Sequence, residues 1–161
     1  MPRIRSYRPE DWSSFVELDI ETGLMSLHDP AAEEQEHFKA RWPEVLRNKF
    51  AWSAAGPTTN NGTLLVLETD DGAYAGHLWL SEQEDLFSGQ RKLWVTTVAV
   101  VAQYRGRGFG RLLVERALEE MKARGLGAIG LGVDARNEAA RKLYSTMGFV
   151  TMRVSMERRR G

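Results

Sequence analysis

The pattern of apolar and polar positions in the first third of the chain predicts one strand, two helices and a loop. Residues 3–8 alternate in polarity and predict a short strand, and residues 10–27 carry apolar side chains at helical spacing. Residues 31–50 predict a second helical stretch that is interrupted or kinked at Pro43, because proline has no backbone N–H for the helix. Turn-forming residues over 54–63 predict a loop.

The middle of the chain predicts strands that run back and forth. Residues 64–81 are two strand-like runs around the sequence Asp-Asp-Gly, which is a strong hairpin signal. Residues 82–92 are polar and predict a loop after the hairpin. Residues 93–101 are apolar enough to form a strand in the centre of a sheet. An antiparallel meander is therefore expected after the two helices.

The last third of the chain predicts alternating helices and strands. A helix follows a glycine-rich turn and ends near Gly125, and residues 128–134 predict a buried strand. Asn137 is suited to cap a helix that Gly148 closes, and residues 149–156 predict a last strand. This order is typical of an open sheet covered by helices. The apolar face of the first of these helices is expected to consist of Phe109, Leu112, Leu113, Ala117 and Met121.

Composition restricts the kinds of protein to consider. The 161 residues suit one domain with a real core, and a formal net charge of zero gives no electrostatic case for nucleic acid or an anionic membrane. The N-terminal sequence is polar and no apolar stretch approaches the length of a membrane span. The chain has no cysteine, and its three histidines have no metal-ligand spacing, so we expect no thiolate chemistry and no metal. A cytoplasmic protein is the expectation.

The glycine-rich turn between residues 98 and 118 is the first candidate for chemistry. Glycines at 106, 108 and 110 alternate with Arg105 and Arg107, directly before a helix. The N-terminus of a helix has unpaired amides that suit an anion, and glycines let a phosphate approach them. The spacing matches neither the P-loop nor the dinucleotide-binding pattern. A phosphate site is favoured, and an ordinary strand-to-helix connection remains the alternative.

Two motifs together resemble those of a known family. Residues 103–110, with Gln103 followed by Gly106 and Gly108, match the [QR]-x-x-G-x-[GA] signature of the GCN5-related N-acetyltransferase superfamily. Residues 137–149 match its second signature, N-x-x-A-x-x-L-Y-x-x-x-G-F. The resemblance implies a single-domain α/β fold over residues 1–161, with a mixed, mostly antiparallel sheet, a splayed central strand and about four flanking helices. Residues 1–92 would form the acceptor side and residues 93–149 the acetyl-CoA-binding core.

The resemblance also assigns roles to individual residues. Backbone groups of the central strand would pair with pantetheine, amides of the glycine-rich turn would bind the pyrophosphate, and Asn137 would hydrogen-bond the pantetheine. The hydroxyl of Tyr144 would lie near the thioester sulfur as a general acid, although its apolar neighbours, taken without the glycine-rich motif, favour core packing. The expected residues of the acetyl-CoA site are Val98, Val100, Gln103, Arg105, Gly106, Arg107, Gly108, Phe109, Gly110, Arg111 and Asn137.

The implied activity is transfer of an acetyl group from acetyl-CoA to a primary amine of a small molecule or peptide. Without cysteine, we expect direct attack by the amine, with the Val98 amide stabilising the oxyanion. Many family members carry a glutamate on the central strand as general base, and residues 93–100 have none. Glu82 and Glu84 are the expected ends of a water-mediated path, with Glu21 and His28 as further candidates.

One alternative accompanies this interpretation. A non-catalytic acyl-CoA-binding or sensor module of the same fold would also explain the glycine-rich turn, and the missing strand glutamate mildly favours it. The expected partners are acetyl-CoA and an amine acceptor, and a second copy of the chain is compatible with the resemblance.

Overall fold

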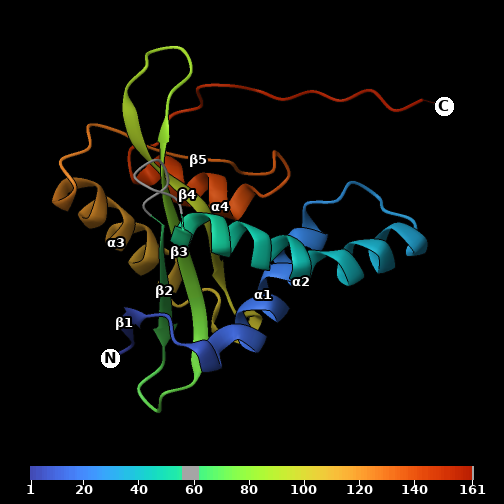
Figure 1. Ribbon diagram of the computed structural model, residues 1–161, viewed down its shortest axis with the longest axis horizontal. Helices are drawn as coiled ribbons and strands as arrows, with labels where there is room; N and C mark the ends of the chain where they lie inside the picture. The colour runs from blue at the N-terminus through green and yellow to red at the C-terminus, as the bar shows by residue number, and fades with distance from the viewer. Residues whose placement is uncertain (56–61, 161) are drawn as a thin grey trace. The chain divides into compact units, whose positions relative to one another are not determined.

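The computed structural model describes residues 1–55 and 62–160 of the chain. Residues Met1–Leu131 form one compact unit and residues Gly132–Gly161 a second. A five-stranded sheet and α-helices confirm the expected α/β class, whereas a single domain over residues 1–161 stays a prediction. The elements are labelled in Figure 1, and in chain order they are β1 (Arg3–Ser6), η1 (Pro9–Asp11), α1 (Trp12–Met25), α2 (Ala32–Ala55), β2 (Thr63–Glu68), β3 (Tyr74–Glu84), β4 (Arg91–Val100), η2 (Ala102–Tyr104), α3 (Phe109–Ala123), β5 (Ile129–Leu131) and α4 (Glu138–Thr146).

The sheet of the first unit is mixed and mostly antiparallel, as expected. Its strands lie in the order β1-β2-β3-β4-β5, and only the pair β4–β5 is parallel. The hairpin between β2 and β3 is confirmed, and its turn includes Gly72 with φ +83°, a conformation that glycine adopts without strain. The meander therefore follows from local turn chemistry.

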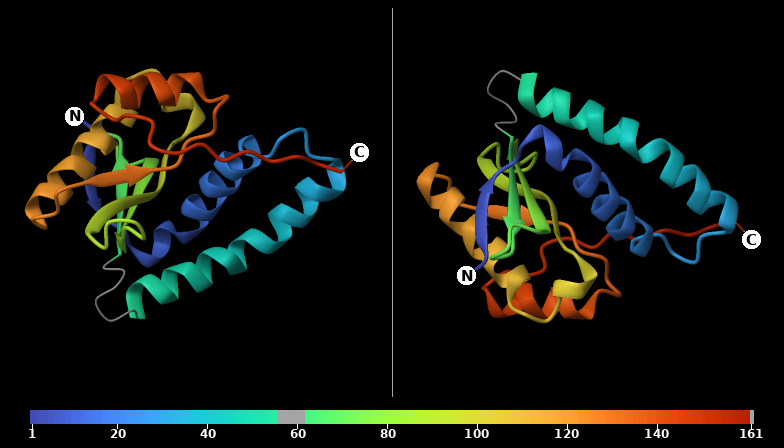
Figure 2. Two further views of the ribbon diagram at one scale, coloured as in Figure 1. Left: turned by 90° about the horizontal axis from the view of Figure 1, so that it is seen from above. Right: turned by 90° about the horizontal axis from the view of Figure 1, so that it is seen from below.

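Helices cover both faces of this sheet. Alternate residues of β3 point to opposite faces, so Leu78 and Leu80 pack with Leu113 of α3, whereas Trp79 packs with Phe15 of α1. Figure 2 shows α3 on one side of the sheet and α1 with α2 on the other. Strand β4 contributes Leu93 and Val95 to the core that it shares with α3, the helix that follows the glycine-rich turn.

Two predictions for the first half of the chain need correction. Helix α2 is not interrupted at Pro43, since one proline removes a single backbone hydrogen bond from a long helix, and a kink at Pro43 stays a prediction. The polar loop predicted over residues 82–92 is limited to residues 85–90, because β3 extends to Glu84 and β4 begins at Arg91. Polar side chains are tolerated there because Glu82 pairs with Arg91 and Arg124 across neighbouring elements. Residues 56–61 of the loop predicted at 54–63 lie outside the described residues.

Three predictions for the second half need correction. Leu112 is 37% exposed and lies off the apolar face of α3, where Val114 is buried instead. Strand β5 has three residues rather than the seven of the predicted range 128–134. Residues 149–156 form no strand among the described residues, although their polarity alternates. The segment has the sequence pattern of a strand, but among the described residues no other strand pairs with it.

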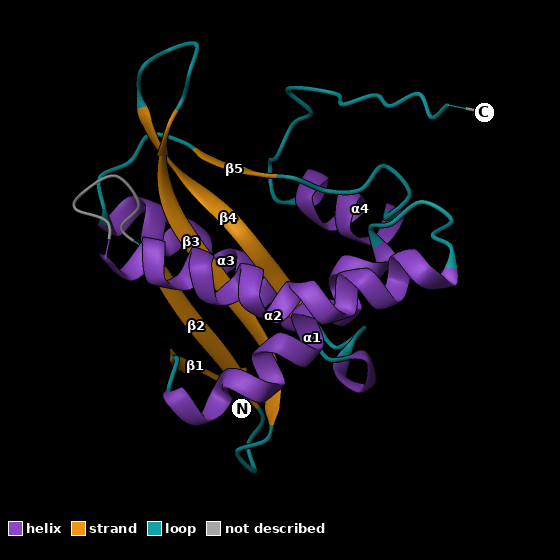
Figure 3. Ribbon diagram, turned by 45° about the vertical axis from the view of Figure 1, so that its right-hand side comes forward, coloured by secondary structure: helices purple, strands orange, loops and turns teal. Residues whose placement is uncertain are grey.

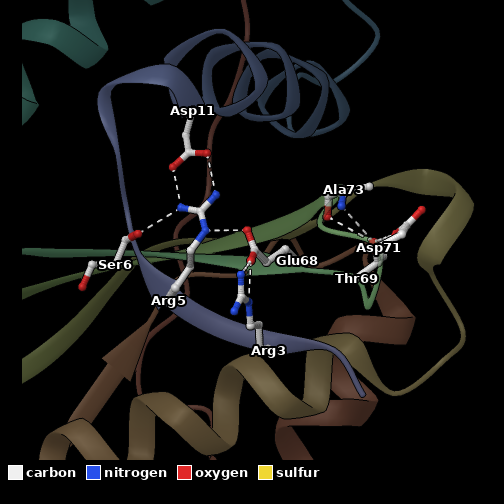
Figure 4. Close-up of polar contacts among 8 residues, drawn as sticks. All are labelled: Arg3, Arg5, Ser6, Asp11, Glu68, Thr69, Asp71 and Ala73. Carbon is white, nitrogen blue, oxygen red and sulfur yellow. Dashed lines mark hydrogen bonds and ion pairs between the residues drawn. The ribbon is translucent and has the colours of Figure 1, made fainter.

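A charged cluster ties β1 to β2 and to the start of α1 (Figure 4). Arg5 donates from Nη1 and Nη2 to the two carboxylate oxygens of Asp11, at 2.7 and 2.8 Å, and from Nε to Glu68 at 2.5 Å. Arg3 donates to the other oxygen of Glu68 at 2.5 Å. These hydrogen bonds from arginine lower the pKa of both carboxyl groups. The cluster stabilises the β1 edge of the sheet, which is the edge opposite β5.

Candidate functional site

The central strand β4 has an open stretch on the side that faces β5. Strand β5 pairs with β4 only at Leu93, Trp94 and Val95, and residues 97–100 of β4 have ladder partners among the described residues only in β3. Figure 3 shows β5 alongside β4 near the β3–β4 hairpin, and β4 continuing beyond the end of β5. The register between β3 and β4 shifts at Thr96, which is the extra residue of a β-bulge. The expected splay of the central strand is confirmed.

The backbone of the open stretch directs polar groups into the gap. The amide of Val101 donates to the Ala75 carbonyl at 2.9 Å, so alternate residues of this end of β4 face β3. Val98 and Val100 lie between them and direct their amides and carbonyls away from β3. These are the groups expected to pair with pantetheine. The structure thus provides the edge that the prediction requires, and the pairing itself stays a prediction.

The glycine-rich turn has the conformation that its sequence indicates. Gly106 and Gly108 have φ of +75° and +82°, and a Cβ at either position would meet no atom within 4 Å. Both glycines are therefore needed for backbone conformation and not for lack of space. The amide of Leu112 donates to the Gly108 carbonyl, which is the first hydrogen bond of α3. The amides of Phe109 and Gly110 thus have no partner within the helix and suit an anion.

The arginines of this turn are held by neighbouring groups. Arg105 donates from Nε to the Val100 carbonyl at 2.9 Å and from Nη2 to Glu21 of α1 at 2.7 Å. The guanidinium of Arg107 lies 5.5 Å from the centre of the Tyr104 ring. Arg107 and Gln103 are exposed at the surface of the turn. Positive charge is therefore concentrated at the end of β4, where a phosphate is expected.

Asn137 and Tyr144 belong to the second unit, and their positions are described within it. The Asn137 Oδ1 accepts a hydrogen bond from the Ala140 amide at 3.1 Å, which confirms Asn137 as the cap of α4. Tyr144 is half-buried, with its ring 5.7 Å from that of Phe149, and burial raises the pKa of its hydroxyl above the ordinary value of 10.0. A tyrosine that stays protonated at neutral pH suits the role of general acid, which stays a prediction.

The two glutamates expected to serve as a base lie far along the sheet from the open stretch. Glu82 is opposite Leu93 and Glu84 is opposite Arg91. Five residues separate Leu93 from Val98, which is roughly 17 Å of strand. Glu82 accepts from Arg91 at 2.8 Å and from Arg124 at 3.2 Å, and these hydrogen bonds lower the pKa of its carboxyl group. Such a carboxylate holds a proton weakly, so its surroundings disfavour the role of base.

A buried polar cluster that the sequence did not indicate lies beside the open stretch. His77 of β3 is opposite Ala99 and is fully buried. Its Nδ1 lies 2.8 Å from the Tyr74 hydroxyl, and its Nε2 lies 3.5 Å from Oδ1 of Asp19 in α1. The other oxygen of Asp19 accepts from the Trp42 indole of α2 at 2.6 Å. The cluster fixes both acceptor-side helices against the strand that neighbours Val98 and Val100.

Across residues 1–55 and 62–160, histidine and carboxylate side chains form no group of three that suits a metal ion. Among the same residues, no helix has the length and apolar character needed to span a membrane.

The first unit is thus an α/β fold whose bulged central strand leads into a glycine-rich turn and a helix. The sequence model of the acetyltransferase (GNAT) family matches residues 23–149, and the chain belongs to this family. The expected resemblance is therefore confirmed.

Relatives with curated names share part of the chain. It is 39% identical over 90 residues to mycothiol acetyltransferase of Beutenbergia cavernae, covering 56% of this chain and 29% of that protein. It is 40% identical over 116 residues to the ribosomal protein bS18–alanine N-acetyltransferase of Salmonella typhimurium, covering 68% of this chain and 72% of the relative. The chain spans less than a third of the mycothiol acetyltransferases that it matches.

Solved structures share the fold over nearly the whole chain. A protein of Pyrococcus furiosus superposes with a TM-score of 0.81 at 23% identity, over 99% of both chains. A GCN5-related N-acetyltransferase of Ralstonia eutropha superposes with a TM-score of 0.77 at 18% identity, over 100% of both chains. At these identities the comparison establishes the fold.

Proposed function

We propose that this protein transfers the acetyl group of acetyl-CoA to the α-amino group of an amino acid or of a peptide N-terminus. The observation that supports the donor is the open stretch of β4, where Val98 and Val100 direct backbone groups into the gap next to the glycine-rich turn. Pantetheine amides suit these groups, and the exposed amides and arginines at the start of α3 suit the pyrophosphate.

The proposed reaction is direct attack of the amine on the thioester. The amine nitrogen forms a bond to the acetyl carbon, the C–S bond breaks, and the Val98 amide stabilises the oxyanion between these events. Tyr144 donates its proton to the departing thiolate, and the nitrogen loses a proton to water. The chain has no cysteine that could form a thioester-linked acyl-enzyme. Glu82 and Glu84 stay candidates for a water-mediated base.

The choice of an α-amine as the proposed acceptor depends on the lack of a carboxylate on β4. An α-amine with pKa near 8 needs roughly 1.4 kcal/mol to be neutral at pH 7, whereas a lysine amine with pKa near 10.4 needs about 4.6 kcal/mol. A site with no ionisable group along residues 93–100 suits the less basic amine. The relative from Salmonella typhimurium, a ribosomal protein bS18–alanine N-acetyltransferase, agrees with this choice.

The test is release of thiol from acetyl-CoA with two matched peptides. One has a free N-terminal alanine and no lysine, and the other has an acetylated N-terminus and one lysine. We expect turnover with the first and at least tenfold less with the second at neutral pH. Preference for the lysine peptide would overturn the acceptor. Tight binding of acetyl-CoA with no turnover on either peptide or on free amino acids would support the binding module.

A further inference from the structure

Two buried polar atoms in the first unit have no hydrogen-bond partner in the protein. Among the described residues, His77 Nε2 and Thr97 Oγ1 are buried side-chain atoms that make no hydrogen bond. Buried polar atoms are almost always paired, because burial removes the hydrogen bonds that water supplies. An unpaired atom therefore indicates a bound water, an ion or a role in a reaction. The reaction proposed above uses neither residue.

The two unpaired atoms come from neighbouring strands. His77 of β3 is opposite Ala99 of β4, and Thr97 is opposite Trp79. Opposite residues of an antiparallel pair point to the same face, so His77 and Thr97 lie diagonally across from each other on one face of the sheet. The Cβ atoms of such a diagonal pair are roughly 7 Å apart, a distance that one water can bridge between an imidazole and a hydroxyl. The Phe15 ring lies 4.7 Å from the His77 ring, so this is the face that α1 and α2 cover (Figure 2).

Asp19 and Tyr74 lie beside the two nitrogens of the His77 ring. Asp19 Oδ1 is 3.5 Å from Nε2, which is near enough to stabilise a positive charge on the ring but too far for a good hydrogen bond. The Tyr74 hydroxyl is 2.8 Å from Nδ1, and burial raises the pKa of this hydroxyl, so it keeps its proton. When Nδ1 carries the ring proton and donates it to the Tyr74 oxygen, the lone pair of Nε2 is free to accept another.

In the described part of the chain, the other side chains that contact or oppose these groups carry no charge. They are Val66 of β2, Ala99 of β4, Phe15 of α1 and, through its hydrogen bond with Asp19, the Trp42 indole of α2. Asp19 is therefore the charge that stabilises a proton added to His77, and the two residues act as one titrating pair.

We propose that His77 is the proton acceptor of the acetyl transfer, and that it receives the proton of the attacking amine through the Thr97 hydroxyl and one bound water. This inference rests on the proposed function. Thr97 directly precedes Val98, whose amide is the proposed oxyanion donor, and its side chain is on the face of β4 that the acceptor-side helices cover. Thr97 is only partly buried as a residue whereas its Oγ1 is buried, so it connects the attacking nitrogen with the buried pair. A central strand without a carboxylate thereby uses a base on its neighbour.

Every group on this path has the donors and acceptors that the transfer needs. The water donates one hydrogen to His77 Nε2 and one to Asp19 Oδ1 and accepts one from Thr97 Oγ1, which pairs both orphan atoms. After the amine nitrogen bonds to the acetyl carbon, its proton passes to the Thr97 oxygen, the hydroxyl proton passes to the water, and a water proton passes to Nε2. The C–S bond then breaks with its electron pair on sulfur. The imidazolium beside Asp19 returns its proton to solvent after the product leaves.

The first test is the pH profile of kcat/KM for thiol release with the N-terminal alanyl peptide. In the wild type both the amine and His77 must have lost a proton, so on the acid side kcat/KM should fall with the second power of the proton concentration. His77→Gln keeps a polar side chain but removes the proton acceptor. Its kcat/KM should be at least tenfold lower at neutral pH and should fall only with the first power. A lower Tm with a profile of unchanged order would assign His77 to structure and overturn the proposal.

The second test changes the hydroxyl and leaves His77 in place. Valine has nearly the shape of threonine and suits a strand, and the hydroxyl that Thr97→Val removes has no partner in the protein. We expect kcat/KM at least tenfold lower, with little change in Tm or in coenzyme A affinity by calorimetric titration. Thr97→Ser restores the hydroxyl and should recover most of the activity. Wild-type activity in Thr97→Val, or equal losses in the two variants, would overturn the path.

Failure of this path and failure of the proposed function give different results. A wild type that releases no thiol with any amine would refute the acetyl transfer and, with it, the need for a proton acceptor. A wild type that turns over, with an unchanged pH profile in both His77→Gln and Thr97→Val, would keep the acetyl transfer and refute the path alone. Far-UV circular dichroism checks that each variant folds.

Discussion

The Nε of Arg105 lies 2.9 Å from the carbonyl oxygen of Val100, at the end of the open stretch of β4. This carbonyl is one of the groups expected to accept a hydrogen bond from pantetheine. The same guanidinium pairs with Glu21 of α1 at 2.7 Å, so a helix of the acceptor side holds the arginine on the strand. A ligand that pairs with Val100 therefore competes with Arg105 for this carbonyl, and an arginine that the ligand displaces becomes available to a phosphate.

Glu21→Gln is expected to strengthen acetyl-CoA binding. The pair is about half exposed, and such pairs contribute about 0.2–1 kcal/mol, so the dissociation constant should fall by up to about fivefold. Calorimetric titration with coenzyme A measures the change. Glu36→Gln, which removes an exposed pair with Lys39, is the control and should leave binding unchanged. Weaker binding in Glu21→Gln would show that the carboxylate positions Arg105 for the ligand.

Gly108→Val is expected to remove most of the coenzyme A affinity, by at least tenfold, while the protein still folds. Valine is strained at φ +82°, so the turn should rearrange and move its amides. Gly72→Val is a matched control, because Gly72 also has positive φ and space for a Cβ with no atom within 4 Å, but lies in the β2–β3 turn. Both variants should lose similar thermal stability. Unchanged affinity in a folded Gly108→Val would refute the phosphate site.

Tyr144→Phe is expected to lower kcat by about 10²-fold with a small change in acetyl-CoA affinity, because it removes only the proton donor. Pre-steady-state and steady-state thiol release measure the effect. Tyr104→Phe is the control, since the Tyr104 ring stacks on Phe109 and its hydroxyl has no proposed role. Full activity with a lower Tm in Tyr144→Phe would assign this tyrosine to packing.

Features set by local chemistry could be predicted from the sequence. The cap at Asn137 depends on one side chain and an amide three residues away, and the turns at Gly72 and Gly108 depend on positive φ. The family motifs predict the splay of β4, and its short pairing with β5 confirms it. Such features can be predicted without knowing which distant segments of the chain pack together.

Features that depend on distant partners could not be predicted. Asp19, Trp42 and His77 come from three elements, and only the packing of α1 and α2 on β3 brings them together. The polarity of Glu82 predicts a solvated loop, whereas Arg91 and Arg124 satisfy its carboxylate in a strand. For residues 149–156 the sequence predicts a strand and the structure has none. The alternating pattern of a strand does not specify which other strand it pairs with.

Arg5→Ala is expected to lower Tm by roughly 10 °C at neutral pH, because it leaves the carboxylates of Asp11 and Glu68 without their principal partner. Lys39→Ala removes an exposed pair and should change Tm little. Scanning calorimetry compares the two. An equal change of Tm in both variants would show that the cluster contributes little to the stability of the fold.

The same cluster predicts how stability depends on pH. Arg5 lowers the pKa of Asp11 and of Glu68 in the folded protein, so the unfolded chain binds more protons in acid. Their stabilising contribution is complete above the ordinary carboxyl pKa near 4 and is lost as the pH falls through the lower folded values. In Arg5→Ala the drop in stability between pH 5 and pH 3 should therefore be smaller than in the wild type. An unchanged pH dependence would contradict this assignment.

Glu82→Gln is expected to reduce stability more than catalysis. The change weakens the contacts with Arg91 and Arg124, so Tm should fall, whereas a carboxylate with a lowered pKa is a poor acceptor for a proton from an amine. The pH profile of kcat/KM with an N-terminal alanyl peptide should keep its wild-type shape, rising toward the acceptor's pKa. Glu84→Gln is the control, because Glu84 lies at the exposed end of β3. If either variant instead loses activity at neutral pH and recovers as the pH approaches the acceptor's pKa, that glutamate is the end of the water-mediated path.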